Sequence, residues 1–230
     1  MFISKDILYE DNHILVVNKM IGQGVQADDS GEMALDDDVK EFIRLRDAKE
    51  GNVFLGVVHR IDKPVSGAVV FAKSSKALRR LNEMVKEHQI KKTYWAIVCK
   101  KPPTEAAVLE HYIVKDNVKN RSFAYDKEKN GAKIARLEYE LVCVSQNFYL
   151  LQVNLITGRH HQIRAQLSKV GMPIKGDLKY GSERSNKDGG ICLHARTVEF
   201  IHPVTKVNVK ITAPVPQEDN LWRYFESCLK

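Results

Sequence analysis

The residues best suited to chemistry lie in the segment 59–67, which reads His-Arg-Ile-Asp-Lys-Pro-Val-Ser-Gly. Apolar runs precede and follow it, at 53–58 and 68–71. A carboxylate at the end of a β-like run, beside basic residues and a Pro/Ser/Gly turn, is a common way to hold a reactive acid rigidly at a cleft. A lone Arg-x-Asp is more often a surface turn. Asp62 is therefore a candidate catalytic acid. Whether it is catalytic or an ordinary turn residue has to be judged from the rest of the chain.

Two more segments carry side chains that could take part. Residues 91–98 place Tyr94 in a strand-like run, where its ring could stack on a base and its phenol could move a proton. Residues 157–164 read Thr-Gly-Arg-His-His-Gln-Ile-Arg. A guanidinium beside a carboxylate lowers the pKa of that carboxylate by roughly 1–3 units, and Arg164 is the candidate for this role beside Asp62. Taken singly, Tyr94 would be a core aromatic and Arg164 an ordinary surface arginine.

The three segments together resemble the motifs of the RluA-type pseudouridine synthases. Those motifs read His-Arg-Leu-Asp-x-x-Thr-Ser-Gly, Lys-x-Tyr-x-Ala-x-Val and Thr-Gly-Arg-x-His-Gln-Ile-Arg. This chain departs at Ile61 and Val65 in the first motif, and it has Met20 where the family's opening segment usually has Pro. The motifs occur in the family's order, and the resemblance runs from about residue 8 to residue 216.

The resemblance implies an enzyme that isomerises uridine in RNA to pseudouridine after flipping the base out of its stack, without a cofactor or a metal. Asp62 would be the nucleophile, Tyr94 would stack on the uracil and could remove the C5 proton, and Arg164 would keep Asp62 ionised. Attack on C1′, attack on the base and a glycal route all stay open. The residues expected to bind substrate are His59, Arg60, Arg159, His161, Gln162 and Ile163, with Arg60 helping to occupy the vacated space.

The family also implies an α+β catalytic domain, with a mixed and mostly antiparallel sheet bent around a central cleft and flanked by helices and loops. We expect one such domain over 1–230 and no N-terminal S4 RNA-binding domain, since the signature begins near residue 8. RNA choice would then come from the loops 22–34, 115–132 and 181–191.

Hydrophobic periodicity gives a coarse view of the elements, and strands outnumber helices without alternating with them, which favours α+β. Helices are expected at 34–46, from a cap at Ser74 or Ser75, at 159–170 with Gly171 closing it, and from about 217. Strands are expected at 14–18, 94–98, 106–114, 120–125, 135–144, 148–156, 192–202 and 206–213.

Charge and composition narrow the choice of partner. The chain of 230 residues has a formal net charge of +7. Eight Lys/Arg lie between Arg159 and Arg196 against three acids, which favours phosphate contacts over a merely solvated face. No long apolar run or secretory signal is visible, and the four cysteines are widely spaced, so a cytoplasmic protein is expected. We expect RNA as the partner, in a tRNA or rRNA stem-loop, with no guide RNA, no membrane and a monomeric enzyme.

Two other functions are weighed against this one. A non-catalytic RNA-binding or RNA-folding protein would have no use for Asp62, Tyr94 and Arg164 together. A glycosidic-bond hydrolase usually needs two carboxylates, and the motifs offer only Asp62 and Asp177, of which Asp177 is read as a turn residue. His194 and His202 are eight residues apart, a spacing that fits no usual metal-ligand pattern.

Overall fold

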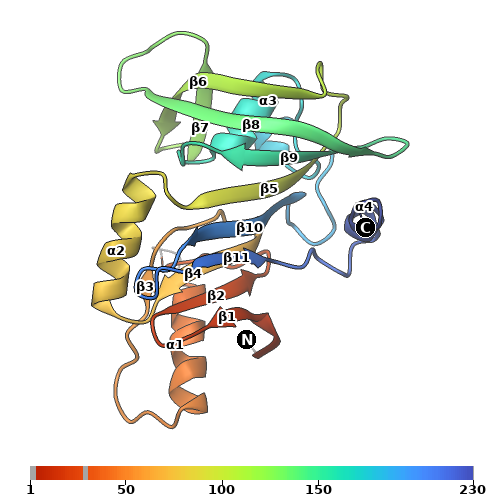
Figure 1. Cartoon of the computed structure of the whole chain (residues 1–230). Coiled ribbons are helices and arrows are strands. Elements are labelled where there is room, and N and C mark those ends of the chain that lie inside the picture. Colours follow the sequence, from red (N-terminus) through yellow and green to blue (C-terminus); the bar gives the residue numbers. More distant parts are fainter. Residues whose placement is uncertain (1–3, 28–30, 230) are drawn as a thin grey trace. The chain divides into compact units, whose positions relative to one another are not determined.

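The computed structural model describes residues 4–27 and 31–229, and within them the chain forms eleven strands, four α-helices and two short 3₁₀ helices (Figure 1). It divides into two compact units, each described here by itself. Unit 1 comprises residues 1–91 and 195–215, and unit 2 comprises residues 92–194 and 216–230. The segment 195–215 returns to unit 1 after residues 92–194 of unit 2, and the chain then re-enters unit 2 at residue 216, so strand β10 (Leu193–Ile201) begins in unit 2 and ends in unit 1.

Unit 1 is built on strands in the order β1-β2-β4-β10, with β3 beside β4 and β11 beside β10. The 3₁₀ helix η1 (Ser4–Asp6) leads into β1, and helices α1 and α2 belong to the same unit. The bounds are β1 Ile7–Glu10, β2 Ile14–Lys19, α1 Leu35–Arg46, β3 Gly56–Val57, β4 Ser66–Ala72, α2 Ser75–Lys86 and β11 Asn208–Thr212. The pairs β1·β2, β2·β4, β3·β4 and β10·β11 are all antiparallel.

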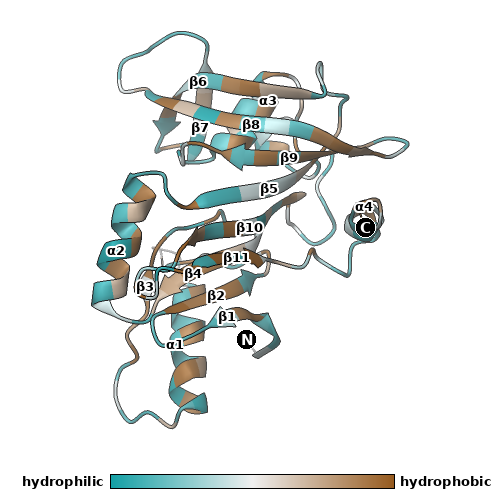
Figure 2. Ribbon diagram, viewed as in Figure 1, coloured by the Kyte–Doolittle hydropathy of each residue, from teal (hydrophilic) through white to brown (hydrophobic). Residues whose placement is uncertain are grey.

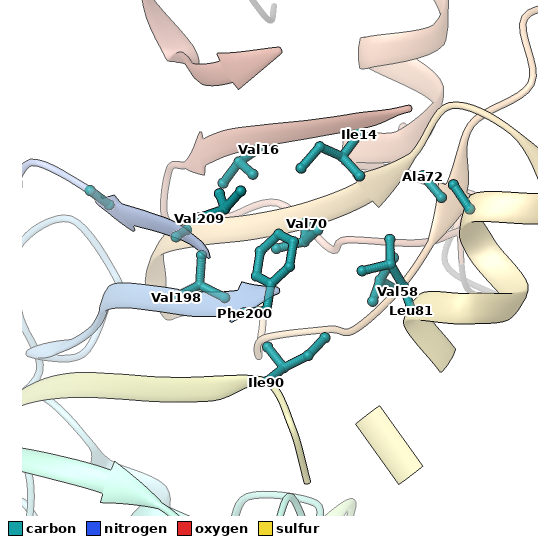
Figure 3. Close-up of a cluster of buried hydrophobic side chains, with 13 residues drawn as sticks. Ile14, Val16, Val58, Val70, Ala72, Leu81, Ile90, Val198, Phe200 and Val209 are labelled. Atoms are coloured by element: carbon teal, nitrogen blue, oxygen red, sulfur yellow. The ribbon is translucent and has the colours of Figure 1, made fainter. Parts of the chain in front are cut away.

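A cluster of buried aliphatic and aromatic side chains holds this unit together (Figure 3). Every residue of β4 is buried, and β2 is buried at all but one position, which explains why both strands read as continuous apolar runs and not as alternating ones. Figure 2 shows β2 mostly in brown, whereas α2 carries hydrophilic and hydrophobic residues side by side. Leu81 of α2 and Phe200 of β10 join the cluster, and each fully buried side chain of this size contributes roughly 1.5–3 kcal/mol.

Unit 2 contains an antiparallel series of strands in the order β5-β9-β8-β6-β7. Helix α3 contacts β6 and β7, and the 3₁₀ helix η2 contacts α3. Helix α4 is capped by Asp219, whose carboxylate accepts the Leu221 amide at 2.7 Å. The bounds are β5 Lys91–Val98, β6 Ala106–Asp116, β7 Arg121–Tyr125, β8 Lys133–Val144, β9 Tyr149–Leu155, α3 Gln162–Lys169, η2 Leu178–Tyr180 and α4 Asn220–Ser227.

The α+β class and the mostly antiparallel strands are confirmed, and the expected cap of α2 is Ser74, whose hydroxyl accepts the Ala77 amide at 3.2 Å. One expectation is wrong. The helix expected at 159–170 begins only at Gln162, because His161 adopts a left-handed conformation with φ 52°. Gly171, with φ 80°, follows the helix as expected. Three expectations stay predictions: a single domain over 1–230, a central cleft, and the absence of an N-terminal S4 domain.

No helix among the described residues is long and apolar enough to cross a membrane.

Candidate active site

Asp62 lies in a backbone-fixed turn between β3 and β4. The Val65 amide donates to the carbonyl of Asp62 at 3.0 Å, and the next carbonyl, that of Lys63, accepts from the Gly22 amide at 2.9 Å. The Val65 side chain is buried, so the position that carries Thr in the family motif faces the apolar interior here. The turn keeps its geometry through the backbone and needs no hydroxyl at Val65.

A buried ammonium supports the same turn. Lys19, at the end of β2, is 0% exposed. Its Nζ donates to the Met20 carbonyl at 2.9 Å and to the Lys63 carbonyl at 3.1 Å. Burial lowers the pKa of Lys19 to about 7, while the nearby Asp62 carboxylate opposes that shift. Lys19 is thus a positioning residue of the Asp62 turn.

The flanks of the 59–67 segment are held to β4 and β10. The Val70 amide donates to His59 Nε2 at 3.2 Å, so this nitrogen, proposed for substrate, is engaged with the protein backbone. Arg60 is exposed, as a side chain that enters RNA must be. Gly67 has φ 116°, and a Cβ there would come within 2.3 Å of the Ala195 carbonyl oxygen, so the motif's glycine is a steric requirement.

Tyr94 lies in unit 2. It is buried at 7% exposure in β5, opposite Val153 of β9. Alternation along the strand puts Lys92 and Tyr94 on the same face of β5. The strand fixes the position of the Tyr94 ring, which a stacking platform requires.

The loop 157–161 is fixed by Gln162. Its Oε1 accepts from the Thr157 hydroxyl at 2.8 Å and from the Arg159 amide at 2.9 Å, and its Nε2 donates to the Arg136 carbonyl at 3.0 Å. Gln162 and Ile163 are both buried. Both residues were expected to bind substrate. Their contacts and burial favour a role in shaping the loop. Arg159 is half-buried, and its Nε donates to the Ile134 carbonyl at 3.0 Å.

His160 and His161 stack on each other with ring centroids 3.8 Å apart. His160 Nδ1 lies 2.9 Å from the Ser122 hydroxyl, and His161 Nδ1 lies 3.0 Å from the Tyr180 hydroxyl. Because that hydroxyl accepts the Ser122 amide at 2.8 Å, its own proton can be donated to His161 Nδ1.

Arg164 forms a buried, two-bond ion pair with Asp177. Arg164 Nε lies 2.7 Å from Asp177 Oδ2, and Nη2 lies 2.9 Å from Oδ1. The exposed fractions of the two side chains are 6% and 1%. The guanidinium also lies 5.0 Å from the ring centroid of Tyr180. The interpretation of Asp177 as a turn residue missed this pairing, which depends on the chain turn between α3 and η2.

The expected side chains are thus distributed over both units. Asp62, His59 and Arg60 lie in unit 1, whereas Tyr94 and the residues of 157–164 lie in unit 2. The structure brings Arg164 together with Asp177, and its expected pairing with Asp62 stays a prediction. Among the described residues, no group of three or more His, Cys, Asp or Glu could hold a metal ion. His202 instead lies 2.9 Å from Asp11 and accepts the amides of Val204 and Thr205.

The chain matches known proteins over most of its length. Residues 13–169 match the family described as RNA pseudouridylate synthase. The chain is 32% identical to ribosomal large subunit pseudouridine synthase C of Buchnera aphidicola (subspecies Baizongia pistaciae) over 217 residues, covering 91% of this chain and 66% of the relative. It is 31% identical to the uncharacterized RNA pseudouridine synthase YhcT of Bacillus subtilis, covering 96% and 72%. This chain therefore spans about two thirds of the length of the curated relatives it matches.

The fold has solved counterparts as well. The human protein RNA pseudouridylate synthase domain containing 4 superposes with a TM-score of 0.78 at 22% identity, over 98% of this chain and 92% of that one. Human RNA pseudouridylate synthase domain containing 1 gives a TM-score of 0.72 at 21% identity. At these identities the likeness concerns the fold, and it confirms the architecture expected from the sequence.

Proposed function

This chain belongs to the RNA pseudouridylate synthase family, and we propose that it isomerises specific uridines in structured RNA by an aspartate-dependent, cofactor-free mechanism. The observation that carries the proposal is the fixed turn around Asp62. Its backbone is held by the Val65 amide, and the following carbonyl is held by Lys19 and Gly22. A reacting group held in this way needs little reorganisation during the reaction.

The reaction breaks the N1–C1′ bond, rotates the uracil and joins C5 to C1′; the C5 proton is removed, N1 takes up a proton, and the substrate is neither oxidised nor reduced. Asp62 supplies the nucleophilic or acid/base oxygen. Tyr94 stacks on the detached uracil and is placed to take part in removing the C5 proton. Arg164, oriented by Asp177, keeps Asp62 ionised. Arg60 fills the space that the flipped base leaves, which offsets part of the few kcal/mol that flipping costs.

The substrate is proposed to be a uridine in a stem-loop of large-subunit rRNA or of tRNA. Several curated relatives are named for the ribosomal large subunit. A uridine in a loop is cheaper to flip than one in a helix, and its edges are open to reading. We propose that the chain acts as a monomer in the cytoplasm and selects its site without a guide RNA. The loops 22–34, of which 28–30 lie outside the described residues, 115–132 and 181–191 are the proposed determinants of RNA choice.

The test is pseudouridine mapping in RNA treated with the purified chain. Wild-type protein should introduce pseudouridine at one or a few positions of protein-free rRNA or tRNA transcripts. Asp62→Asn, which is nearly isosteric, should lower turnover at least about a hundredfold while leaving thermal stability and RNA affinity nearly unchanged. Residual turnover of more than a few per cent would place the nucleophile elsewhere.

The alternative of a non-catalytic RNA-binding protein predicts a different outcome. Wild type and Asp62→Asn would then bind the same RNAs with equal affinity, and neither would form pseudouridine in any transcript. A requirement for an assembled ribosomal subunit or a guide RNA would contradict the loop-recognition part of the proposal and leave the catalytic part intact.

A further inference from the structure

Lys92 carries a half-buried ammonium that the chemistry described above does not use. It is the second residue of β5 and shares a strand face with Tyr94, two residues further along. Thr93 pairs with Asn154 of β9, which places Lys92 next to the end of β9 and to the loop that follows it. This ammonium therefore lies on the Tyr94 side of unit 2, close to the loop 157–161.

The ammonium lies beside the position that a side chain at Gly158 of this loop would occupy. A Cβ built on Gly158 would lie 3.7 Å from Lys92 Nζ, which is ordinary van der Waals contact. Gly158 itself is exposed, whereas its neighbour Thr157 is buried. Because Gly158 has no side chain, a ligand that reaches the loop from solvent meets the ammonium without an intervening group.

The Lys92 ammonium has no counter-charge in its surroundings. Among the residues that the structure describes, it makes no hydrogen bond or ion pair. Burial alone lowers the pKa of Lys92, and no carboxylate opposes that shift. A cation that is withdrawn from water costs free energy unless it is paired. The Lys92 ammonium is therefore suited to bind an anionic ligand, which would pair its charge.

The other lysines of the described residues that are not fully exposed all have hydrogen-bond partners. Lys19 is more deeply buried, but its Nζ donates to two carbonyls. Lys175 donates to Asn186 Oδ1 at 2.6 Å, and Lys169 pairs with Asp126 at 2.8 Å. Lys92 is thus set apart by being half-buried, unpaired within the described residues and next to a side chain expected to stack on the target base.

We propose that the Lys92 ammonium, beside the open backbone of Gly158, binds a phosphodiester oxygen of the RNA strand next to the target uridine. The inference rests on the proposed function, since it assumes that RNA enters on the Tyr94 side of β5. The phosphate supplies the charge that the ammonium lacks, and a charge-assisted N–H···O bond in a partly desolvated site is stronger than a neutral one. One fixed phosphate next to the target also sets the register of the strand, so that one nucleotide and not its neighbour meets Tyr94.

The test replaces single phosphates in the RNA. Stem-loop substrates carrying one uncharged methylphosphonate linkage at each position around the target uridine are bound to the protein in the Asp62→Asn background, which blocks turnover. In this background the protein with Lys92 intact should lose affinity on the order of tenfold at one linkage adjacent to the target. Lys92→Met should bind unmodified RNA weaker by the same factor, and the methylphosphonate at that linkage should then cost nothing further.

Three variants guard against trivial explanations. Lys91→Met removes an exposed neighbouring charge and should keep the full methylphosphonate effect. Lys92→Arg keeps the charge and should restore most of the affinity. Gly158→Ala leaves Lys92 intact but places a methyl group beside Nζ at an ordinary contact distance, so it should fold normally and weaken binding at the same linkage. With Asp62 present, Lys92→Met should lower kcat/KM by about the factor that it loses in affinity, because the phosphate contact is made on binding and kept in the transition state.

The outcomes separate this inference from the proposed function. Suppose that wild type forms pseudouridine while each methylphosphonate lowers the RNA affinity of Lys92→Met as much as that of the protein with Lys92 intact. In that case the phosphate contact is refuted and the function stands. If Lys92→Met instead loses turnover at saturation without coupling to any linkage, the ammonium acts on the base or the ribose, which also overturns the inference. If wild type binds no RNA, both proposals fall together.

Discussion

At the scale of single side chains, the pair formed by Arg164 and Asp177 determines what else Arg164 can do. Asp177 occupies the edge of the guanidinium that carries Nε and one Nη2 hydrogen. A contact to a second carboxylate must therefore use Nη1 or the other Nη2 hydrogen. An arginine held on one side by a buried acid presents its remaining donors in one orientation, which a lysine cannot do.

We predict that Asp177→Asn destabilises the protein and lowers turnover. The substitution leaves the shape nearly unchanged, but it removes the negative charge of a pair whose members are 6% and 1% exposed, and it places amide hydrogens against a guanidinium donor. Removing one partner of a buried ion pair typically costs about 3–5 kcal/mol. Urea unfolding of the wild type and the variant measures this loss, and Glu183→Gln, at an exposed position, is the matched control.

A double variant separates stability from activity at this pair. Replacing both members with apolar residues, as Arg164→Met with Asp177→Leu, should recover much of the lost stability, because no buried charge is then left uncompensated. Turnover should not recover, since the proposed chemistry needs the guanidinium. An Asp177→Asn protein as stable as wild type would contradict the structural importance of the pair, and an active double variant would remove Arg164 from the mechanism.

The same pair shows what a sequence can reveal at this scale. The resemblance of three segments to the family motifs singled out Asp62, Tyr94 and Arg164, and each carries a group that the proposed chemistry needs. The partner of Arg164 was beyond reach, because Asp177 becomes its neighbour only through the turn from α3 to η2. The role of Gln162 was hidden for the same reason: its contacts to Thr157 and Arg136 depend on a loop conformation and on β8.

At the scale of elements, the boundaries that differ from expectation have local causes. Apolar periodicity predicted α1, α2 and the long strands β6, β8 and β9 well, because burial repeats regularly along them. It extended α3 to residue 159 because Arg, His and Gln are all compatible with a helix. The left-handed backbone of His161, together with the side-chain contacts of Gln162 to the loop, makes 159–161 a loop instead. Such a feature has no periodic signal.

Lys19 links two elements, the end of β2 and the turn that carries Asp62, and its ionisation should appear in the stability of the protein. The folded-state pKa of Lys19 is about 7, against 10.5 for the free side chain. Between these two pH values the unfolded chain binds more protons than the folded one, so this group makes the free energy of unfolding increase as pH rises. Below pH 7 the ammonium is charged in both states and its burial cost is constant.

We therefore predict that wild type gains stability relative to Lys19→Met between about pH 7.5 and pH 9.5. The gain should be on the order of 1 kcal/mol per pH unit, measured as the difference between their free energies of unfolding in urea. Taking the difference cancels the groups common to both proteins. Lys76→Met, at an exposed position of α2, should run parallel to wild type, and parallel curves for Lys19→Met would mean that the ammonium keeps its ordinary pKa.

At the scale of the whole molecule, the excess of positive charge is the property most directly tied to a polyanionic substrate. The formal net charge is +7, and the basic stretch 159–196 carries a large share of the excess. Not all of its charges are equally available. Lys175 and Lys179 donate to Asn186 and to the Asn120 carbonyl. Arg184 and Lys187 are exposed, and within the described part of the chain neither forms an ion pair.

These two residues lead to the last prediction, on the salt dependence of RNA binding. Each single-strand phosphate that a protein neutralises adds about 0.7 to the slope of log affinity against log salt concentration. If the stretch 159–196 contacts the phosphate backbone of the RNA, the double variant Arg184→Glu with Lys187→Glu should bind a stem-loop substrate more weakly. Its slope should be shallower by roughly the contribution of one to two phosphates. Turnover at saturating RNA should be unchanged, because neither side chain lies among the groups proposed for the chemistry. Lys76→Glu, outside the stretch, should leave the slope as it is in wild type. A steep slope that the double variant does not alter would place the phosphate contacts on another surface. A slope near zero in wild type would instead show that the net charge of the chain takes no part in binding RNA.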